Sequence, residues 1–426
     1  MLEISTLRNK RDQVVNGLAK RQFTAGPIVD KVIQLDDRRK ELQTQLDQLL
    51  NERNALSKEI GGLFKQGKQD EANDKKDRVN VIKDQVSGLE EQLTVVRLEL
   101  ETELISLPNV PHESVPAGSN EEDNEVFRPF QGELPQLANS AKPHWELAEE
   151  YGIFDLELGV KITGSGFPVF RGQGARLQRG LIGYFLDKAA EAGYEEFVPP
   201  LIVNEDSARG TGQLPDKEGQ MYYINEDDFY LIPTAEVPLT NIYRDVILNE
   251  EDFPIKLTGF TPCFRREAGS YGAHVRGLNR VHQFDKVEIV QIAHPDKSYE
   301  VLDQMVEHVA GLLNSLELPY RILRLCGGDT GFVSALTYDF EVWSAAQKRW
   351  LEVSSVSNFE TFQANRLKLR YRDGETRKTR LAHTLNGSAL ALPRIIAALL
   401  ENNQGPDGIV LPKVLHSYVG KTTLQK

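Results

Sequence analysis

Apolar residues recur at alternating spacings of four and three along residues 28–107, which is the period of a coiled coil. In the first half the repeat positions are Ile28, Val32, Leu35, Arg39, Leu42, Leu46, Leu49, Arg53, Leu56, Ile60 and Leu63. In the second half they are Val79, Ile82, Val86, Leu89, Leu93, Val96, Leu100, Leu104 and Leu107. Gly61, Gly62 and Gly67 weaken the helix between the halves, so we expect a turn near residues 65–72. The pattern predicts an antiparallel helical hairpin with arms of about 38 residues, roughly 57 Å long at 1.5 Å per residue.

The polar positions of this hairpin face water, so we expect it to project from the rest of the protein as an arm. A coiled coil most often binds another protein, and 13 Lys/Arg against 17 Asp/Glu over residues 27–106 do not favour RNA. Basic residues do gather around the predicted tip, at Lys65, Lys68, Lys75, Lys76 and Arg78. Acidic residues are interleaved with them, so both a phosphate contact and a solvated tip fit this pattern.

The pattern changes after the hairpin. Pro108, Pro111 and Pro116 end the second helix, and we place a domain boundary there, with domains at residues 1–110 and 111–426. In the second domain, strand-like runs at 197–203, 229–232, 257–264 and 281–291 mix with helical runs at 174–193, 298–316 and 390–401. Strands and helices do not alternate regularly, which predicts an α+β fold with a mostly antiparallel sheet. The sequence has neither a P-loop nor a strand-linked G-x-G-x-x-G turn.

Composition narrows the classes of function. The 426 residues carry a formal net charge of −13, so any RNA contact must come from a local basic patch. Cys263 and Cys326 are far apart in sequence and the eight histidines lack zinc-ligand spacing, so we expect no zinc site and a reducing compartment. No apolar run is long enough to span a bilayer, and we expect a cytoplasmic protein without a membrane segment.

Residues 257–290 carry the strongest chemical signal. An apolar strand ends in Phe264-Arg265-Arg266-Glu267, a Gly-rich loop follows, and a second strand leads through Phe284 to Glu288. Cations for phosphates, an aromatic ring for adenine and a carboxylate for polar groups are what an ATP site requires. A fixed guanidinium at Arg265 could stabilise charge that develops on a phosphoryl group. A structural ion pair between Arg265 and Glu267 is the alternative.

Two further elements fit the same ligand. Pro393 suits the first turn of a helix, and Arg394 beside it is an unfavourable cation at a helix start unless an anion binds there. A surface arginine at a helix start is the plain alternative. Glu352-Val353-Ser354-Ser355 offers a carboxylate and hydroxyls to a hard cation, although such a tetrapeptide is common.

The strand–loop–strand resembles motif 2 of the class II aminoacyl-tRNA synthetases, and residues 193–202 with Pro200 resemble their motif 1. Residues 390–401 resemble motif 3, and Thr234-Ala235-Glu236 resembles a loop of the seryl-tRNA synthetase family. The resemblance covers the whole chain, arm included. It implies a class II catalytic domain with a tRNA-binding coiled-coil arm.

The resemblance also implies roles for individual residues. It places ATP on Arg265, Arg266, Glu267, Phe284, Glu352, Val353, Ser354, Ser355 and Arg394. It places L-serine on Thr234, Ala235, Glu236, Arg265, Glu288 and Ser388. Arg265 and Arg394 would be catalytic, and Glu352 and Ser355 would hold the Mg²⁺ that accompanies ATP. Which carboxylate contacts the ammonium of serine and which contacts its hydroxyl stays open.

The implied activity is an ATP-dependent serine–tRNA ligase that forms seryl-adenylate and then charges tRNA(Ser), and by the same link tRNA(Sec), as a homodimer. The motif 2 loop departs from the usual pattern at Ala273-His274-Val275, which leaves Arg276 and Arg280 as candidates to contact the tRNA acceptor end. Two rivals are a ligase that loads an amino acid onto a carrier protein, whose relatives lack the long arm, and an inactive homologue used as a scaffold.

Overall fold

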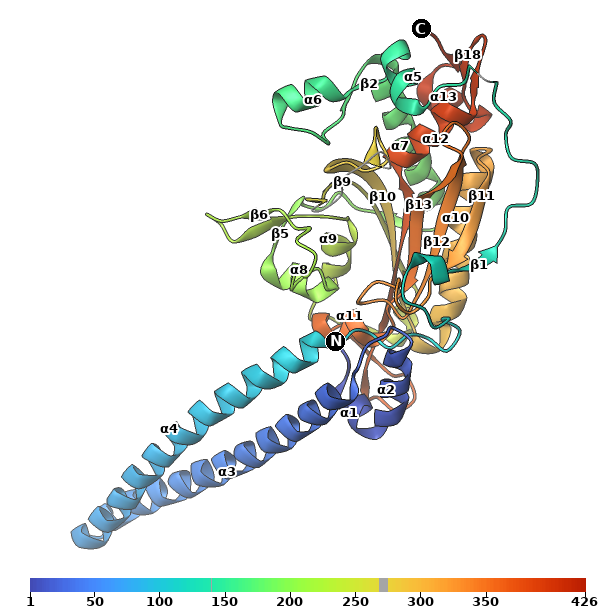
Figure 1. Ribbon diagram of the computed structural model, residues 1–426. Helices are drawn as coiled ribbons and strands as arrows, with labels where there is room; N and C mark the ends of the chain where they lie inside the picture. The colour runs from blue at the N-terminus through green and yellow to red at the C-terminus, as the bar shows by residue number, and fades with distance from the viewer. Residues whose placement is uncertain (139, 268–274) are drawn as a thin grey trace. The chain divides into compact units, whose positions relative to one another are not determined.

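The computed structural model describes residues 1–138, 140–267 and 275–426 (Figure 1). The chain divides into two compact units. The first comprises Met1–Ala19 and Phe23–Pro108, and the second comprises Lys20–Gln22 and Asn109–Lys426.

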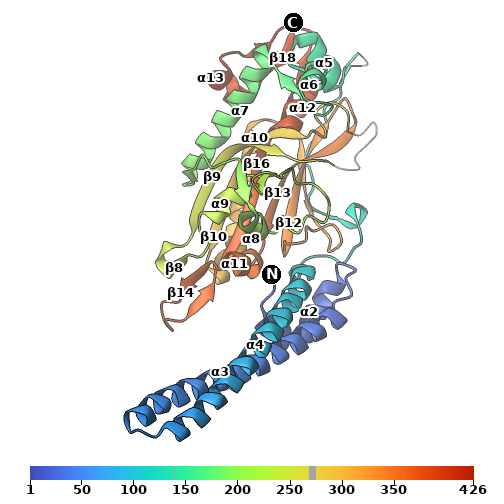
Figure 2. The same ribbon diagram turned by 90° about the vertical axis from the view of Figure 1, so that its left-hand side faces the viewer.

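The first unit is helical. Its helices are α1 (Ile4–Asn9), α2 (Arg11–Ala19), α3 (Gly26–Lys65) and α4 (Gln69–Ser106). The helices α3 and α4 are antiparallel and lie side by side (Figure 2), with Leu42, Leu46, Ile82, Val86 and Leu93 buried between them. The turn occupies residues 66–68, so the hairpin and its turn are confirmed. The heptad repeat is what brings these apolar side chains onto one seam.

The seam is not apolar where α1 packs on α3. Asp36, beside the repeat position at Leu35, is only 2% exposed. Its carboxylate accepts hydrogen bonds from Arg8 of α1 at 2.9 Å and from Arg39 at 2.7 Å. Arg39 therefore interrupts the apolar repeat where its guanidinium, together with Arg8 of α1, holds the buried Asp36 carboxylate.

The second unit is built on an eight-stranded sheet in the order β1-β11-β12-β13-β16-β10-β9-β4. All neighbours are antiparallel except β4 and β9, which confirms the predicted α+β class. In chain order the strands are β1 (Glu125–Arg128), β4 (Glu195–Glu196), β9 (Ile255–Phe264), β10 (Gln283–Ala293), β11 (Tyr320–Arg324), β12 (Leu336–Ser344), β13 (Arg349–Asn358) and β16 (His383–Ala391).

Alternation along the strands gives the sheet two chemically different faces. Val287 and Ile289 of β10 and Val356 of β13 belong to the main core. The long helices α7 (Gly172–Glu191), α10 (Ser298–Ser315) and α12 (Leu392–Asn402) pack on this face. Because successive side chains of a strand point to opposite faces, Lys286 and Glu288 of β10 lie on the other face of the sheet. The polar face is therefore available for a site.

Shorter elements complete the second unit. The helices are α5 (His144–Tyr151), α6 (Leu156–Ile162), α8 (Glu205–Thr211), α9 (Glu236–Asn241), α11 (Thr361–Leu367) and α13 (His416–Val419). The small sheets pair β2 (Phe154–Asp155) with β3 (Val169–Phe170), and join β5 (Ile202–Asn204), β7 (Phe229–Leu231) and β6 (Tyr223–Ile224). Two others join β8 (Ile247–Asn249), β14 (Arg370–Arg372) and β15 (Thr379–Leu381), and β17 (Gln404–Gly405), β18 (Gly408–Val410) and β19 (Thr423–Leu424). In Figure 1, α8 and α9 lie on the side of the large sheet opposite α10.

One expected strand was wrong. Residues 197–203 were predicted as a single strand, but the structure has β4 at Glu195–Glu196 and β5 at Ile202–Asn204, in two different sheets. Pro199 and Pro200 lie between them and have no backbone N–H to donate to a neighbouring strand. The chain therefore leaves one sheet and enters another at this point.

Candidate active site

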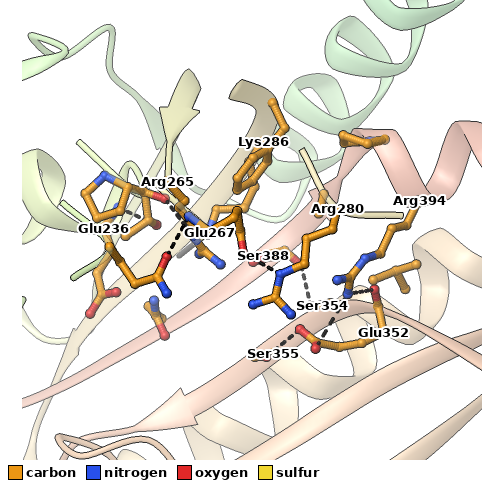
Figure 3. A pocket seen from close by; sticks show the side chains of 18 of the residues that line it. Glu236, Arg265, Glu267, Arg280, Lys286, Glu352, Ser354, Ser355, Ser388 and Arg394 are labelled. Carbon is orange, nitrogen blue, oxygen red and sulfur yellow. Dashed lines mark hydrogen bonds and ion pairs between the residues drawn. The ribbon is translucent and has the colours of Figure 1, made fainter. Parts of the chain in front are cut away.

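The polar face of the sheet borders a cavity of about 460 Å³, and every residue that lines it belongs to the second unit. This volume lies in the range of small-ligand sites. The predicted site residues in its lining are Thr234, Glu236, Arg265, Glu267, Phe284, Glu352, Val353, Ser354, Ser355, Ser388 and Arg394. Three predicted residues lie outside the lining: Ala235 and Glu288 are fully buried, and Arg266 is exposed. Figure 3 shows most of the charged side chains around the cavity.

Arg265 follows the last residue of β9 and is held by the neighbouring strand. Its backbone N–H donates to the His282 carbonyl at 2.9 Å, which extends the β9–β10 pairing past Phe264. Its side-chain Nε donates to the Pro233 carbonyl at 3.3 Å. The guanidinium lies 5.2 Å from the ring centroid of Phe284. Phe284 is on β10 and pairs with Cys263 of β9. The cation and the aromatic ring expected around a nucleotide are therefore adjacent.

Glu267 has a different partner from the one that its position suggested. Arg280, and not Arg265, donates a hydrogen bond to the Glu267 carboxylate. The Glu267 backbone N–H donates to Gln220 Oε1 at 3.0 Å. Arg280, expected near a tRNA acceptor end, thus lines the cavity with Glu267. Ala273 and His274 of the same loop lie outside the described residues, and Arg276 stacks its guanidinium 4.9 Å from the Trp145 ring.

Glu352 and Ser355 reach the same face of β13 because the strand contains a bulge. In a regular strand, residues three apart point to opposite faces. Here Glu352 pairs with Glu341, and Ser354 and Ser355 pair with Phe340 and Asp339, so that Val353 is the extra residue. Ser355 Oγ consequently lies 3.5 Å from Glu352 Oε1, and both line the cavity.

Asp339 adds a second acidic group beside Glu352 and Ser355. It lies across from Ser355 on β12, and its Oδ1 atom is buried and unpartnered. Burial, and then the negative charge of Glu352, raise the pKa of Asp339 well above the usual value of a carboxyl group. The carboxylate and hydroxyl of Glu352 and Ser355 are suitable ligands for Mg²⁺, which prefers oxygen donors.

Arg394 is in the first turn of α12, as the motif predicted. Its Nε donates to the Asn279 carbonyl at 2.9 Å, and its Nη1 donates to the Glu352 carbonyl at 2.7 Å. The Glu352 carboxylate is 3.6 Å from the same nitrogen. These contacts aim the guanidinium along the strand that carries the Glu352–Ser355 pair.

Two carboxyl groups with different partners lie at the opposite end of the cavity, Glu236 in its lining and Glu288 buried behind it. Glu288 is fully buried and lies 2.5 Å from the Lys286 ammonium. It also accepts hydrogen bonds from Thr234 Oγ1 and Asn386 Nδ2, each at 3.1 Å. Burial raises the pKa of Glu288, and the Lys286 charge opposes this rise. Ser388 is directly opposite Glu288 on β16, so their side chains share a face.

Glu236 has a neutral partner instead. Its Oε1 accepts a hydrogen bond from Gln363 Nε2 at 2.6 Å, and Gln363 Oε1 accepts one from Thr384 Oγ1 at 2.7 Å. Glu236 is 6% exposed and lines the cavity. Burial, followed by the charge of Glu288, raises the pKa of Glu236 to about 7.

Sequence reasoning missed several residues of this cavity, including Lys286, Asn386 and Gln220, and also Gln363, which contacts Glu236 from outside the lining. Lys286 was within reach, since it lies two positions before Glu288 on one strand and therefore on the same face. Asn386 and Gln363 come from other elements, and only the pairing of β10 with β16 and the packing of α11 bring them close.

Comparison with known proteins identifies the class first. A family described as the tRNA synthetase class II core domain (G, H, P, S and T) matches residues 221–403, and the seryl-tRNA synthetase N-terminal domain matches residues 1–111. The second unit is thus a class II synthetase core, which confirms the predicted fold.

Relatives over the whole length narrow this to one family. The chain is 52% identical to a serine–tRNA ligase of Salinibacter ruber, over 99% of this chain and 98% of the relative. A crystal structure of seryl-tRNA synthetase from Pyrococcus horikoshii complexed with ATP is similar with a TM-score of 0.90 and 34% identity, over 100% of this chain and 99% of that one. A crystal structure of a cytoplasmic serine–tRNA ligase from Naegleria fowleri in complex with AMP is similar with a TM-score of 0.85 and 25% identity, over 100% of this chain and 99% of that one.

The chain belongs to the seryl-tRNA synthetase family. The expectations of that family and of a ligase are thereby confirmed. ATP as the nucleotide agrees with the ATP complex of the Pyrococcus horikoshii relative. Within the described residues, no helix is both long and apolar enough to cross a membrane.

Proposed function

We propose that this protein activates L-serine with ATP to form seryl-adenylate and transfers the seryl group to tRNA(Ser). One observation carries the proposal: a single cavity has guanidinium groups and an aromatic ring at one end and the buried carboxyl group of Glu236 at the other, where Glu288 is buried behind Lys286 and Asn386 of the lining. The first end suits a nucleoside triphosphate, and the second suits a small amino acid with an ammonium and a hydroxyl group.

At the ATP end, Phe284 would stack on adenine, and Glu267 would accept from the base or orient Arg280. Arg265 would contact the α-phosphate, where charge develops as the serine carboxylate attacks, and Arg394 would bind the γ-phosphate. Glu352 and Ser355 would hold Mg²⁺, which neutralises phosphate charge when it is bound. Catalysis is then mainly positioning and charge stabilisation by groups fixed before the substrates arrive.

At the serine end, the partners of the two carboxyl groups divide their roles. Glu288 already has a cation in Lys286, so it is suited to accept a hydrogen bond from the neutral serine hydroxyl, with Ser388 beside it. Glu236 is held by the neutral amide of Gln363, so the ammonium of serine can supply its positive partner. Alanine would leave a buried acceptor unpaired and be rejected by up to about 10⁴.

The arm formed by α3 and α4 would bind the tRNA by recognising the shape and backbone of the RNA. The overall negative charge of the protein would not contribute to this binding. We propose that residues 1–110 are the tRNA-binding domain and residues 111–426 the catalytic domain. The same recognition would admit tRNA(Sec). Val198, two residues before the motif 1 proline Pro200, is 90% exposed, which supports a homodimer formed through this segment.

Pyrophosphate exchange tests the activity directly. Exchange that depends on serine and needs no tRNA is the expected result, and alanine, glycine and threonine should be poor substrates. Exchange with alanine or glycine alone would favour a ligase that loads a carrier protein. No exchange with any of the four amino acids would favour an inactive RNA-binding scaffold.

The role of the arm needs a separate variant. Replacing residues 30–100 by a short turn should leave serine-dependent exchange near the wild-type rate, because the whole cavity is in the second unit. Charging of tRNA(Ser) should be lost. A truncated protein that charges tRNA normally would remove tRNA binding from the functions of the arm.

A further inference from the structure

Two buried ionisable side chains outside the cavity face each other between helices. His144 is the first residue of α5 and Glu401 is in the last turn of α12, and neither is exposed to solvent. The distance from His144 Nδ1 to Glu401 Oε1 is 2.7 Å. A buried carboxylate is costly unless several donors surround it. Neither side chain touches the proposed substrates, so the pair requires another explanation.

The hydrogen bonds fix the protonation of this pair. The backbone N–H of Leu278 donates to His144 Nε2 at 2.8 Å, so Nε2 must carry its lone pair. The ring proton is therefore on Nδ1 and is donated to Glu401, which makes the imidazole neutral.

The backbone that His144 holds is part of the cavity wall. Gly277 has φ = +69°, and a Cβ there would lie 2.3 Å from His144 Nε2, so only glycine permits this approach. The next two residues, Leu278 and Asn279, line the cavity. The Asn279 carbonyl accepts the hydrogen bond from Arg394 Nε at 2.9 Å. His144 is thus connected to Arg394, which we propose binds a phosphate, through the Leu278 N–H, the Leu278–Asn279 backbone and the Asn279 carbonyl.

A second route connects the same groups. Asn279 Nδ2 donates to Gln347 Oε1 at 2.9 Å, and Gln347 Nε2 donates to Glu401 Oε1 at 3.0 Å. Arg394 and Glu401 are seven residues apart on α12, about two turns, and so lie on one side of the helix. Helix α12 therefore contacts Asn279 from two places. Arg394 at its start donates to the Asn279 carbonyl, and Glu401 near its end is connected to the Asn279 side chain through Gln347.

We propose that the His144–Glu401 pair is a positioning device that fixes Asn279 and thereby orients Arg394 toward the triphosphate of ATP. The assignment of the ligand rests on the proposed function. The neutral imidazole provides what this task requires, namely an acceptor for one backbone N–H and a donor for one carboxylate. Such a side chain acts only through Arg394, so it should affect ATP and not serine.

Two substitutions at His144 separate its two hydrogen bonds. The His144→Asn amide can occupy the place of Nδ1 and donate to Glu401, but it is too short to accept from Leu278. The His144→Gln amide can place its oxygen near Nε2 and accept from Leu278. His144→Asn should raise the Kd for ATP and the KM for ATP in pyrophosphate exchange on the order of tenfold, with the KM for serine unchanged. His144→Gln should bind ATP with nearly the wild-type Kd.

His383→Asn is the matched control. His383 is also a largely buried histidine with a side-chain hydrogen bond, from Nδ1 to Ser298 Oγ at 2.8 Å, and it does not line the cavity. This variant should lower the melting temperature and leave the ATP constants unchanged. If His144→Asn does not fold by circular dichroism, Gln347→Ala cuts the second route at a half-buried residue and should raise the Kd for ATP about threefold.

Direct ATP binding by calorimetry keeps the outcomes distinct. A wild-type protein that binds ATP but shows no serine-dependent exchange would refute the proposed function and leave the comparison of ATP affinities intact. Wild-type ATP affinity in His144→Asn, an equal rise in His144→Gln, or an equal rise in the KM for serine would each overturn the positioning role.

Discussion

The two ends of the cavity contain opposite charges and hold them in different ways. At one end, Arg265 and Arg394 are oriented by backbone carbonyl groups. At the other end, Glu288 is held by the Lys286 ammonium and Glu236 by the neutral amide of Gln363. A charged side chain that is oriented by neutral partners can still form an ion pair with a ligand. A side chain that is already paired with a counter-ion gains less from a charged ligand. The comparison therefore identifies Arg265 and Glu236 as groups that meet ligand charge, whereas Arg394 also has the Glu352 carboxylate at 3.6 Å.

The largest effect should come from removing a cation at the ATP end. Arg265→Ala should lower the rate of serine-dependent pyrophosphate exchange by about 10²–10³ or more, because charge on the α-phosphate loses its fixed partner. Folding should be little affected, as judged by the melting temperature. Arg372→Ala, at an exposed arginine of β14, is the control and should exchange at the wild-type rate. An Arg265→Ala protein with normal exchange would contradict the role of Arg265.

Glu236 should make serine binding depend on pH. Its pKa, raised to about 7 by burial and Glu288, means that the proton binds as pH falls through 7 and the charge for the serine ammonium is lost. The KM for serine should therefore rise about tenfold between pH 8 and pH 6, since the ionised fraction falls by that factor. Glu236→Gln should have a high KM at pH 8 and a nearly flat profile. A wild-type profile that is flat over this range would exclude Glu236 as the ammonium partner.

The smallest effect should come from the hydroxyl at the Glu352 end. Ser355→Ala removes one of two proposed Mg²⁺ ligands and leaves the carboxylate, so the Mg²⁺ concentration for half-maximal exchange should rise a few-fold, roughly 1 kcal/mol of binding. Ser315→Ala is a suitable control outside the cavity lining, because the Ser315 hydroxyl pairs with the Tyr184 hydroxyl. Equal Mg²⁺ requirements in Ser355→Ala and the wild type would remove Ser355 from the metal site.

Much of the fold was predictable because it depends on local pattern. The heptads of residues 28–107 predict α3 and α4, and alternation predicts β9 and β10 with the arginine at the end of the first strand. The broken strand at residues 197–203 follows from the local pair Pro199-Pro200, but other failures involve partners on different strands. The bulge at Val353 depends on the register of β12 against β13, and spacing alone would place Glu352 and Ser355 on opposite faces.

Ion-pair partners were equally hidden from the sequence. Glu267 pairs with Arg280 because the chain turns back between them, although Arg265 is nearer in sequence. Lys286 lies two positions before Glu288 on one strand, but the full burial of Glu288 depends on the β9–β10–β16 pairing, which no single strand reveals. Residue types and order were therefore sufficient to locate the site, whereas the division of labour among its charges required the structure.

A complex with a non-hydrolysable seryl-adenylate mimic examines the opposed-charge account most directly. Diffraction should show the ligand phosphate against the Arg265 guanidinium, the adenine on Phe284, and the ammonium nearer to the Glu236 carboxylate than to Glu288. A ligand bound in this cavity with its ammonium on Glu288, or bound anywhere else, would contradict the account.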